Sequence, residues 1–118
     1  NPDPPFNLPM LAAGAGATYV SRWTVFHIRQ LQKAMAEAIR KRGFSFLEVI
    51  SPCPTLFGRR NKVKEGVDHL KAYRDLAVIK KDPALADAAI EMNGPIICGK
   101  FVDIEKPTLL DRMPASAA

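Results

Sequence analysis

The stretch ATYVSRWTVFHIRQLQKAMAEAIRKRGFSFLEVI, residues 17–50, decides the fold. Its first part, from Ala17 to Trp23, is rich in β-branched and aromatic residues and predicts a strand. A helix is predicted next, capped by Thr24 and ending near Arg42, because apolar side chains recur three and four positions apart. Those side chains are Ile28, Leu31, Met35, Ala38 and Ile39. The segment from Phe44 to Ile50 is short and mostly apolar, which predicts a strand covered on both faces.

A strand, a helix and a strand in this order predict a βαβ unit. Its two strands should be parallel neighbours joined by a right-handed crossover, and the loop after the second strand should leave at the carboxyl edge of the sheet. Open α/β sheets bind ligands at that edge. The sequence therefore predicts an α/β fold with a mainly parallel sheet, and it directs attention to the loop after Ile50.

The predicted elements outside this unit are shorter. Four prolines make residues 1–9 an extended connector, since proline fixes φ and removes a backbone donor. The other predictions are a short helix over 8–15, a helix over 62–79, a small helix over 84–92, a turn at 93–95, a strand over 96–104 and a frayed tail at 113–118.

The composition is that of one soluble domain, with 118 residues, of which 47% are hydrophobic and 25% charged. No apolar run approaches the roughly 18 to 20 residues needed to span a bilayer, and the first residues lack the features of a signal peptide. We therefore expect a cytoplasmic location. The net charge of +5 favours anionic partners, but no nucleic-acid-binding motif accompanies it, so neither nucleic acid nor a membrane is expected as a partner.

The segment SPCPTLFGRRN, residues 51–61, follows the second predicted strand and carries the most chemical content. Cys53 and Cys98 lack paired short spacings, so they predict neither a disulfide framework nor a self-contained zinc site. Taken alone, Cys53 is a small thiol in a proline-flanked turn, and Cys98 is expected to behave as a buried small hydrophobe. Positive charges crowd just beyond Cys53, at Arg59, Arg60, Lys62 and Lys64. They predict either a contact for phosphates or an acidic protein, or simply a solvated face.

Other polar and aromatic residues give weaker signals. Glu48 lies in an apolar strand, where a carboxylate needs a partner, so we expect a paired structural role. His27 and His69 have no neighbouring ligands at metal-binding spacing, which predicts ordinary helix-surface or packed residues. Tyr19 and Trp23 are expected in the core or at an interface.

Four segments together resemble one known family. They are LAAGAGATYV at 11–20, GFSFLEV at 43–49, SPCPT with GRRNK at 51–62, and GKFVDIEKPT at 99–108. The first three resemble, in order and spacing, the β subunits of 2-oxoacid:ferredoxin oxidoreductases, and the fourth is similar to the 2-oxoglutarate branch of that family. The resemblance covers essentially the whole chain and implies that residues 1–118 are the C-terminal half of such a subunit.

The resemblance implies a doubly wound α/β domain of the thiamine-diphosphate-binding type, incomplete without its N-terminal half. Members bind thiamine diphosphate with Mg²⁺ through a Gly-Asp-Gly-Asp turn, which this chain lacks, and they hold a 4Fe–4S cluster. Cys53 matches the one cluster ligand that the C-terminal half supplies. A four-iron cluster normally needs four thiolates, so this chain alone is predicted to bind no cofactor stably and to be inactive.

The implied function is part of an oxidoreductase that decarboxylates a 2-oxoacid, expected to be 2-oxoglutarate. The reaction forms the acyl-CoA and passes electrons to ferredoxin, or runs in reverse. The implied partners are the α subunit, ferredoxin, the 2-oxoacid and coenzyme A, and Arg59, Arg60 and Lys62 are candidate contacts for ferredoxin or coenzyme A phosphates. Two alternatives stay open, namely a basic binding module that lost its cofactor and a structural subunit of a split enzyme.

Overall fold

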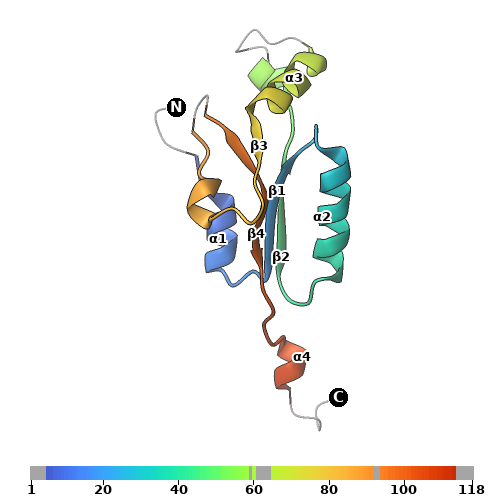
Figure 1. Cartoon of the computed structure of the whole chain (residues 1–118), viewed down its shortest axis with the longest axis vertical. Coiled ribbons are helices and arrows are strands. Elements are labelled where there is room, and N and C mark those ends of the chain that lie inside the picture. Colours follow the sequence, from blue (N-terminus) through green and yellow to red (C-terminus); the bar gives the residue numbers. More distant parts are fainter. Residues whose placement is uncertain (1–4, 59, 61–64, 92–93, 114–118) are drawn as a thin grey trace.

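A computed structural model describes residues 5–58, 60, 65–91 and 94–113. It contains a four-stranded sheet with α1 on one face and α2 on the other (Figure 1). The elements, in chain order, are α1 (Leu8–Gly14), β1 (Tyr19–Thr24), α2 (Ile28–Arg40), β2 (Ser45–Ile50), a π-helical turn η1 (Pro54–Gly58), α3 (Gly66–Leu76), β3 (Ala77–Ile79), a 3₁₀ turn η2 (Leu85–Ala88), β4 (Ile96–Asp103) and α4 (Leu109–Arg112).

The predicted βαβ unit is confirmed. Strands β1 and β2 are parallel, with Tyr19 opposite Ser45 and Thr24 opposite Ile50. The sheet order is β2-β1-β4-β3, in which β4 runs antiparallel to β1 and parallel to β3. Two of these three strand pairs are parallel, so the predicted α/β class with a mainly parallel sheet is also confirmed.

Helix α2 begins later than predicted. Thr24 is the last residue of β1 and does not cap the helix. Its Oγ1 accepts a hydrogen bond from the Phe26 N–H at 3.3 Å and lies 2.9 Å from Nδ1 of His27. Because the Thr24 hydroxyl is used to close the turn after the strand, the first helical residue is Ile28, and the helix ends at Arg40 instead of Arg42.

The expectation that Phe44–Ile50 is covered on both faces is confirmed only in part, because α1 and α2 both contact β2 and most of its residues are half-buried. Strand β2 is an outer strand of the sheet, and Phe44 and Val49 are both exposed. The apolar stripe of α2 is exposed as well, since Ile28 is 61% and Ile39 83% accessible, whereas Ala34 is buried. The apolar pattern was interpreted correctly as a strand and a helix, although part of each apolar surface is exposed in the described part of the chain.

The C-terminal third differs from prediction in its boundaries. The helix expected over 62–79 is α3, and its last three predicted residues instead form β3, because they pair with Ile96–Cys98 of β4. Of the helix expected over 84–92, the described residues 84–91 form only the 3₁₀ turn η2, while the strand expected over 96–104 is confirmed as β4. Helix α4 was not predicted. Residues 114–118 of the predicted tail lie outside the described residues.

The N-terminal helix is confirmed, and it begins inside the predicted connector. Helix α1 starts at Leu8, and Pro9 occupies its first turn, where a missing N–H costs nothing, and is buried. Gly16 follows with a φ of 93°, a conformation that glycine adopts at little cost and that ends the helix. The small residues of α1 allow the helix to lie close on the sheet.

The core is small and lies under α1. Its buried members are Ala12, Ala17 and Val20, with Phe46 and Phe101 packed against them.

The radius of gyration is 17.0 Å, compared with about 13 Å for a compact domain of this length. Within the part of the chain that the structure describes, no helix has the length and apolar character needed to cross a membrane.

Candidate functional site

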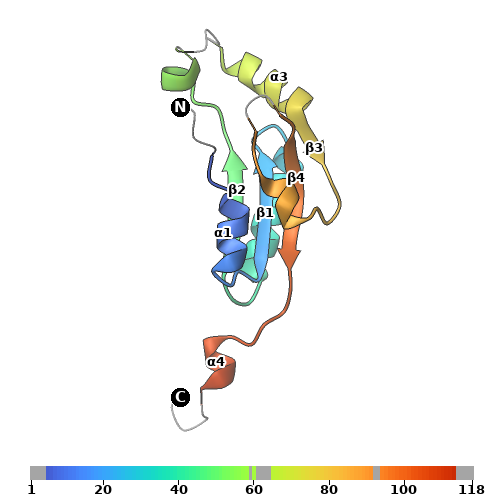
Figure 2. The same cartoon turned by 90° about the vertical axis from the view of Figure 1, so that its left-hand side faces the viewer.

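Strands β1 and β2 end together at one edge of the sheet. They are parallel, and the Val25 N–H just after β1 donates to the Ile50 carbonyl at the end of β2, at 3.0 Å. The chain leaves β2 through Ser51 and Pro52, makes the turn η1 and then enters α3, which lies beyond this end of the sheet (Figure 2). This is the carboxyl edge at which the sequence predicts a ligand site.

Cys53 lies on the loop that leaves β2 at this edge, and it is exposed. The backbone carbonyl of Cys53 accepts a hydrogen bond from the Gly58 N–H at 3.0 Å, and this bond closes the turn η1 that follows Cys53. Pro52 and Pro54 flank it and restrict the backbone, so the thiol is presented from a short and constrained loop. An exposed thiol at this edge can serve as a ligand to a metal centre that another chain segment completes.

Cys98 is the opposite case. It lies in β4, is completely buried, and burial raises the pKa of its thiol to about 11. A thiol with this pKa stays protonated at neutral pH, and the thiolate is the form that binds metals. The structure therefore agrees with the expectation that Cys98 behaves as a small hydrophobe.

Only part of the predicted basic cluster can be located. Arg60 is exposed, two residues beyond the turn η1. Arg59, Lys62 and Lys64 lie outside the described residues. Their proposed contact with phosphates or an acidic protein stays a prediction.

His27 lies at the same carboxyl edge, which sequence reasoning missed. It precedes α2 in the turn after β1, and its ring is 5.3 Å from that of Phe26 in an edge-on arrangement. Desolvation lowers the pKa of the imidazole, and Nδ1 lies 2.9 Å from the Thr24 hydroxyl oxygen. The sequence signal that could have located His27 in a turn was Thr24. A threonine hydroxyl can cap a helix, as predicted here, but it can equally close a turn after a strand.

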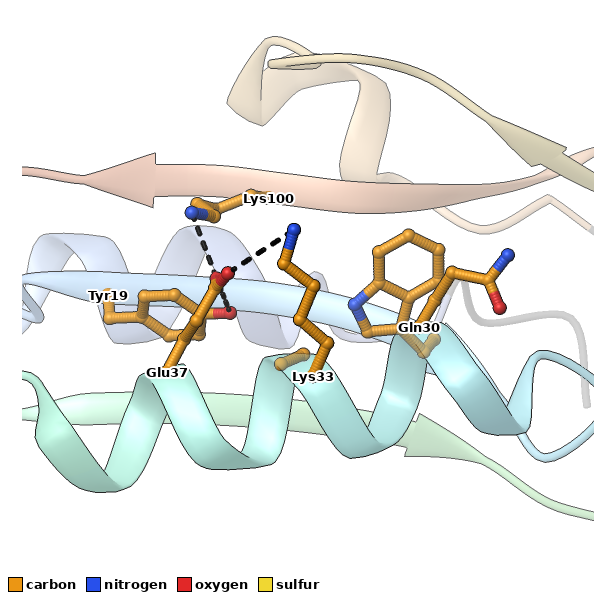
Figure 3. Close-up of a pocket in the computed structure, with 7 residues that line it drawn as sticks. Tyr19, Gln30, Lys33, Glu37 and Lys100 are labelled. Carbon is orange, nitrogen blue, oxygen red and sulfur yellow. Dashed lines mark hydrogen bonds and ion pairs between the residues drawn. The ribbon is translucent and has the colours of Figure 1, made fainter.

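A second group of charged side chains lies between α2 and β4, around a cavity of about 200 Å³ (Figure 3). Its centre is Glu37, whose Oε2 accepts a hydrogen bond from the Tyr19 hydroxyl at 3.2 Å and lies 2.9 Å from Nζ of Lys100. The hydrogen bond from Lys100 is the main cause of the lowered pKa of Glu37. Lys100 also pairs with Asp103 at 2.8 Å. Because these charges neutralise one another, the group serves chiefly to join α2 to β4.

The predicted pairing of Glu48 is confirmed. Its partner is Arg22 on the adjacent strand, and the guanidinium is completely buried. Among the described residues, no three His, Cys, Asp or Glu side chains are arranged to hold a metal ion. Cys53 is the one residue of this chain that the resemblance assigns to the predicted cluster site, and it is among the described residues.

Comparison with known proteins gives one consistent result. The chain is 38% identical over 109 residues to the 2-oxoglutarate synthase subunit KorB of Methanothermobacter marburgensis, a match that covers 92% of this chain and 38% of the relative. The same subunit of Methanocaldococcus jannaschii is 39% identical over 104 residues, covering 87% of this chain and 38% of the relative. The chain is related to the β subunits of 2-oxoacid:ferredoxin oxidoreductases. The predicted resemblance is confirmed.

The relationship extends beyond the subunits named for 2-oxoglutarate. A 2-oxoacid:ferredoxin oxidoreductase β subunit of Aeropyrum pernix is 37% identical over 46 residues, covering 39% of this chain and 15% of the relative. No family model and no solved structure matches the chain. The chain spans about 38% of the length of the KorB subunits that it matches, so most of such a subunit lies outside the matched region.

Proposed function

We propose that this chain is part of the β subunit of a 2-oxoacid:ferredoxin oxidoreductase, of the type that acts on 2-oxoglutarate. The complete enzyme would decarboxylate the 2-oxoacid, form its acyl-CoA and pass electrons to ferredoxin, or run in reverse. The observation that carries the proposal is the exposed Cys53 at the carboxyl edge of the sheet, in a chain related to such subunits. The proposed partners are the α subunit, ferredoxin, the 2-oxoacid and coenzyme A.

Cys53 fits one position of a 4Fe–4S cluster. Its thiol is accessible and its loop is constrained by Pro52 and Pro54, which suits a ligand that has to keep a fixed direction. Such a cluster normally has four thiolate ligands, and we propose that the other three come from the part of the subunit outside this chain. When bound, the cluster would accept electrons from the reacting centre and pass them on singly.

Thiamine diphosphate does not fit this chain alone. The sequence has no Gly-Asp-Gly-Asp turn, and the described residues have no metal-holding group for Mg²⁺. We therefore assign no residue of this chain to that cofactor. The proposed role of this chain is to supply one cluster ligand and to build the sheet edge on which the ligand is mounted.

The surface charges support the alternative of a basic binding module less well than they support the proposed enzyme subunit. Many of the described cations are already paired with carboxylates at the surface, including Lys41, Arg42, Arg74, Lys80 and Lys100. Such pairs reduce the field that an anionic partner would meet. The proposed contact for ferredoxin or coenzyme A phosphates includes Arg60, which is exposed and lies two residues beyond η1.

The test is Cys53→Ala in the complete β subunit assembled with its partner subunit. Iron and acid-labile sulfide per subunit should fall strongly, the electron paramagnetic resonance signal of the reduced cluster should be lost, and ferredoxin reduction should fall with it. The matched control is Cys98→Ala, which removes the buried thiol from β4 and should leave the iron content unchanged. Unchanged iron and sulfide in Cys53→Ala would overturn the assignment.

A further inference from the structure

The loops that follow β1 and β2 leave the sheet side by side. The two strands are parallel neighbours, and their last residues, Thr24 and Ile50, lie opposite each other in the register (Figure 2). The Val25 N–H donates to the Ile50 carbonyl, which keeps the two loops together for one more residue. His27 and Cys53 each come three residues after these last paired residues. Because neighbouring strands lie about 4.8 Å apart, both loops start from adjacent points of the same edge.

The hydroxyl of Thr24 determines which nitrogen of His27 carries the proton. Thr24 is completely buried, and a buried hydroxyl donates to an acceptor. Its oxygen accepts from the Phe26 N–H at 3.3 Å, and among the described residues the one acceptor for its proton is Nδ1 of His27, at 2.9 Å. A nitrogen that accepts carries no proton, so the imidazole is neutral with its proton on Nε2. Burial lowers the pKa of His27, which favours the same neutral form.

The Nε2–H group of His27 has a restricted direction. The hydrogen bond from Thr24 to Nδ1 turns the other ring nitrogen away from the Thr24 hydroxyl. The rings of Trp23 and Phe26 lie 6.3 Å and 5.3 Å from the imidazole, between centroids, and they limit its rotation. Within the part of the chain that the structure describes, no group accepts a hydrogen bond from Nε2. His27 therefore presents a neutral and oriented donor at the carboxyl edge.

A donor of this kind suits an electron-rich sulfur atom. Hydrogen bonds to the sulfur atoms of an iron–sulfur cluster are one of the factors that set its reduction potential. They stabilise the reduced form more than the oxidised form, because the reduced cluster carries the greater negative charge. A cluster held by Cys53 would bring its thiolate and sulfide atoms to the edge that His27 shares.

We propose that His27 donates a hydrogen bond from Nε2–H to a sulfur atom of the cluster bound at Cys53, and thereby raises the reduction potential of that cluster. The inference rests on the proposed function, since it needs a cluster at Cys53. His27 is a positioning residue in this role and not a ligand, and Thr24 orients it. The competing acceptor is an oxygen atom of the substrate or of other polypeptide, which would leave the cluster potential unchanged when His27 is replaced.

The test is a redox titration of the assembled enzyme, followed by the electron paramagnetic resonance signal of the reduced cluster. His27→Phe keeps an aromatic ring and removes the donor. At a fixed potential, the ratio of reduced to oxidised cluster should fall about three- to tenfold, which corresponds to a shift of about 30 to 60 mV for one electron. His27→Gln retains an N–H donor and should restore most of the ratio. An unchanged ratio in His27→Phe, or an equal fall in His27→Gln, overturns the proposal.

The matched control is Phe26→Leu in the same turn. It removes a ring that contacts the imidazole and no hydrogen-bond donor of a side chain, so the ratio should stay as in the unmodified enzyme. A fall as large as that of His27→Phe would show that repacking of the turn causes the shift, and would overturn the assignment to the donor.

A second measurement uses the unmodified enzyme, so it does not depend on the folding of a variant. With histidine labelled by ¹⁵N, pulsed electron paramagnetic resonance should detect an imidazole nitrogen coupled to the reduced cluster, and the coupling should be absent from His27→Gln. Lack of any such coupling in the unmodified enzyme overturns the proposal. Iron and sulfide are measured in the same samples. Normal contents with an unchanged potential overturn only the role of His27, whereas an unmodified enzyme without iron overturns the cluster at Cys53 and this inference with it.

Discussion

Arg22 and Glu48 form a buried ion pair across the two parallel strands β1 and β2, with Nε of the guanidinium 2.5 Å from Oε2 of the carboxylate. The Arg22 side chain has no accessible surface, and its Nη2 donates a second hydrogen bond to the Ala88 carbonyl at 2.7 Å. The guanidinium also lies 5.6 Å from the centre of the Phe101 ring. The pair thus joins both strands to η2 and β4.

Glu48→Ala should destabilise the fold strongly. It leaves a buried guanidinium without its countercharge, a change that typically costs about 3 to 5 kcal/mol. Urea unfolding followed by circular dichroism should show a lower midpoint. The control is Glu105→Ala, since Glu105 also lies 2.5 Å from a cation, Lys41, but its side chain is 78% exposed. The control should leave the midpoint nearly unchanged, and equal losses in the two variants would contradict the role of burial.

The ion pairs around Lys100 predict how stability depends on pH. Hydrogen bonds from Lys100 lower the pKa of Glu37 and of Asp103 below their ordinary values of 4.5 and 3.8. The folded state then binds fewer protons than the unfolded state, so this stabilisation is fully present above about pH 4.5 and is lost as the pH falls through the folded-state values. Glu37→Gln should lose less stability than the original chain between about pH 5 and pH 3 in a series of urea titrations. Parallel curves for the two proteins would contradict this prediction.

Much of the fold could be predicted because its signals are local. The strand Ala17–Trp23, the helix around Ala34 and the strand over 96–104 each show their own periodicity or β-branched content. The exposure of Val49 in β2 could not be predicted, because the apolar pattern of Phe44–Ile50 indicates a covered strand without showing which polypeptide covers it. For the same reason the apolar stripe of α2 was located correctly, but the sequence did not predict the exposure of Ile28 and Ile39.

The candidate site was only partly predictable. The position of Cys53 followed from the order of the elements, since a loop after a parallel strand leaves at the carboxyl edge. Glu48 was expected to have a partner, but Arg22 could not be named until the register of β1 and β2 was known. The Glu37 and Lys100 pair was missed because it joins a helix and a strand far apart in sequence, which no spacing rule reveals.

Gly99→Ala should disrupt the pairing of β3 with β4. Gly99 has a φ of 153°, and a Cβ there would lie 2.4 Å from the Lys80 carbonyl oxygen, a backbone atom that cannot move aside cheaply. We expect a loss of more than about 2 kcal/mol in the free energy of unfolding. Gly14→Ala is the control, because Gly14 is helical and nothing lies within 4 Å of its added Cβ. That variant should be neutral or stabilising by roughly 0.5 to 1 kcal/mol, and a Gly99→Ala variant as stable as the control would contradict the close approach.

The two cysteines should differ sharply in reactivity. Cys53 is exposed on the loop after β2, whereas Cys98 is completely buried with a pKa of about 11. At about pH 8 only roughly one in a thousand Cys98 thiols is ionised, and alkylating reagents attack the thiolate. Brief treatment with iodoacetamide should therefore label Cys53 alone, as peptide mass spectrometry would show, and Cys98 should react only after urea is added. Equal labelling of both cysteines in the folded chain would contradict the burial of Cys98, and a folded chain in which Cys53 is inert would contradict the exposure on which its proposed role as a ligand depends.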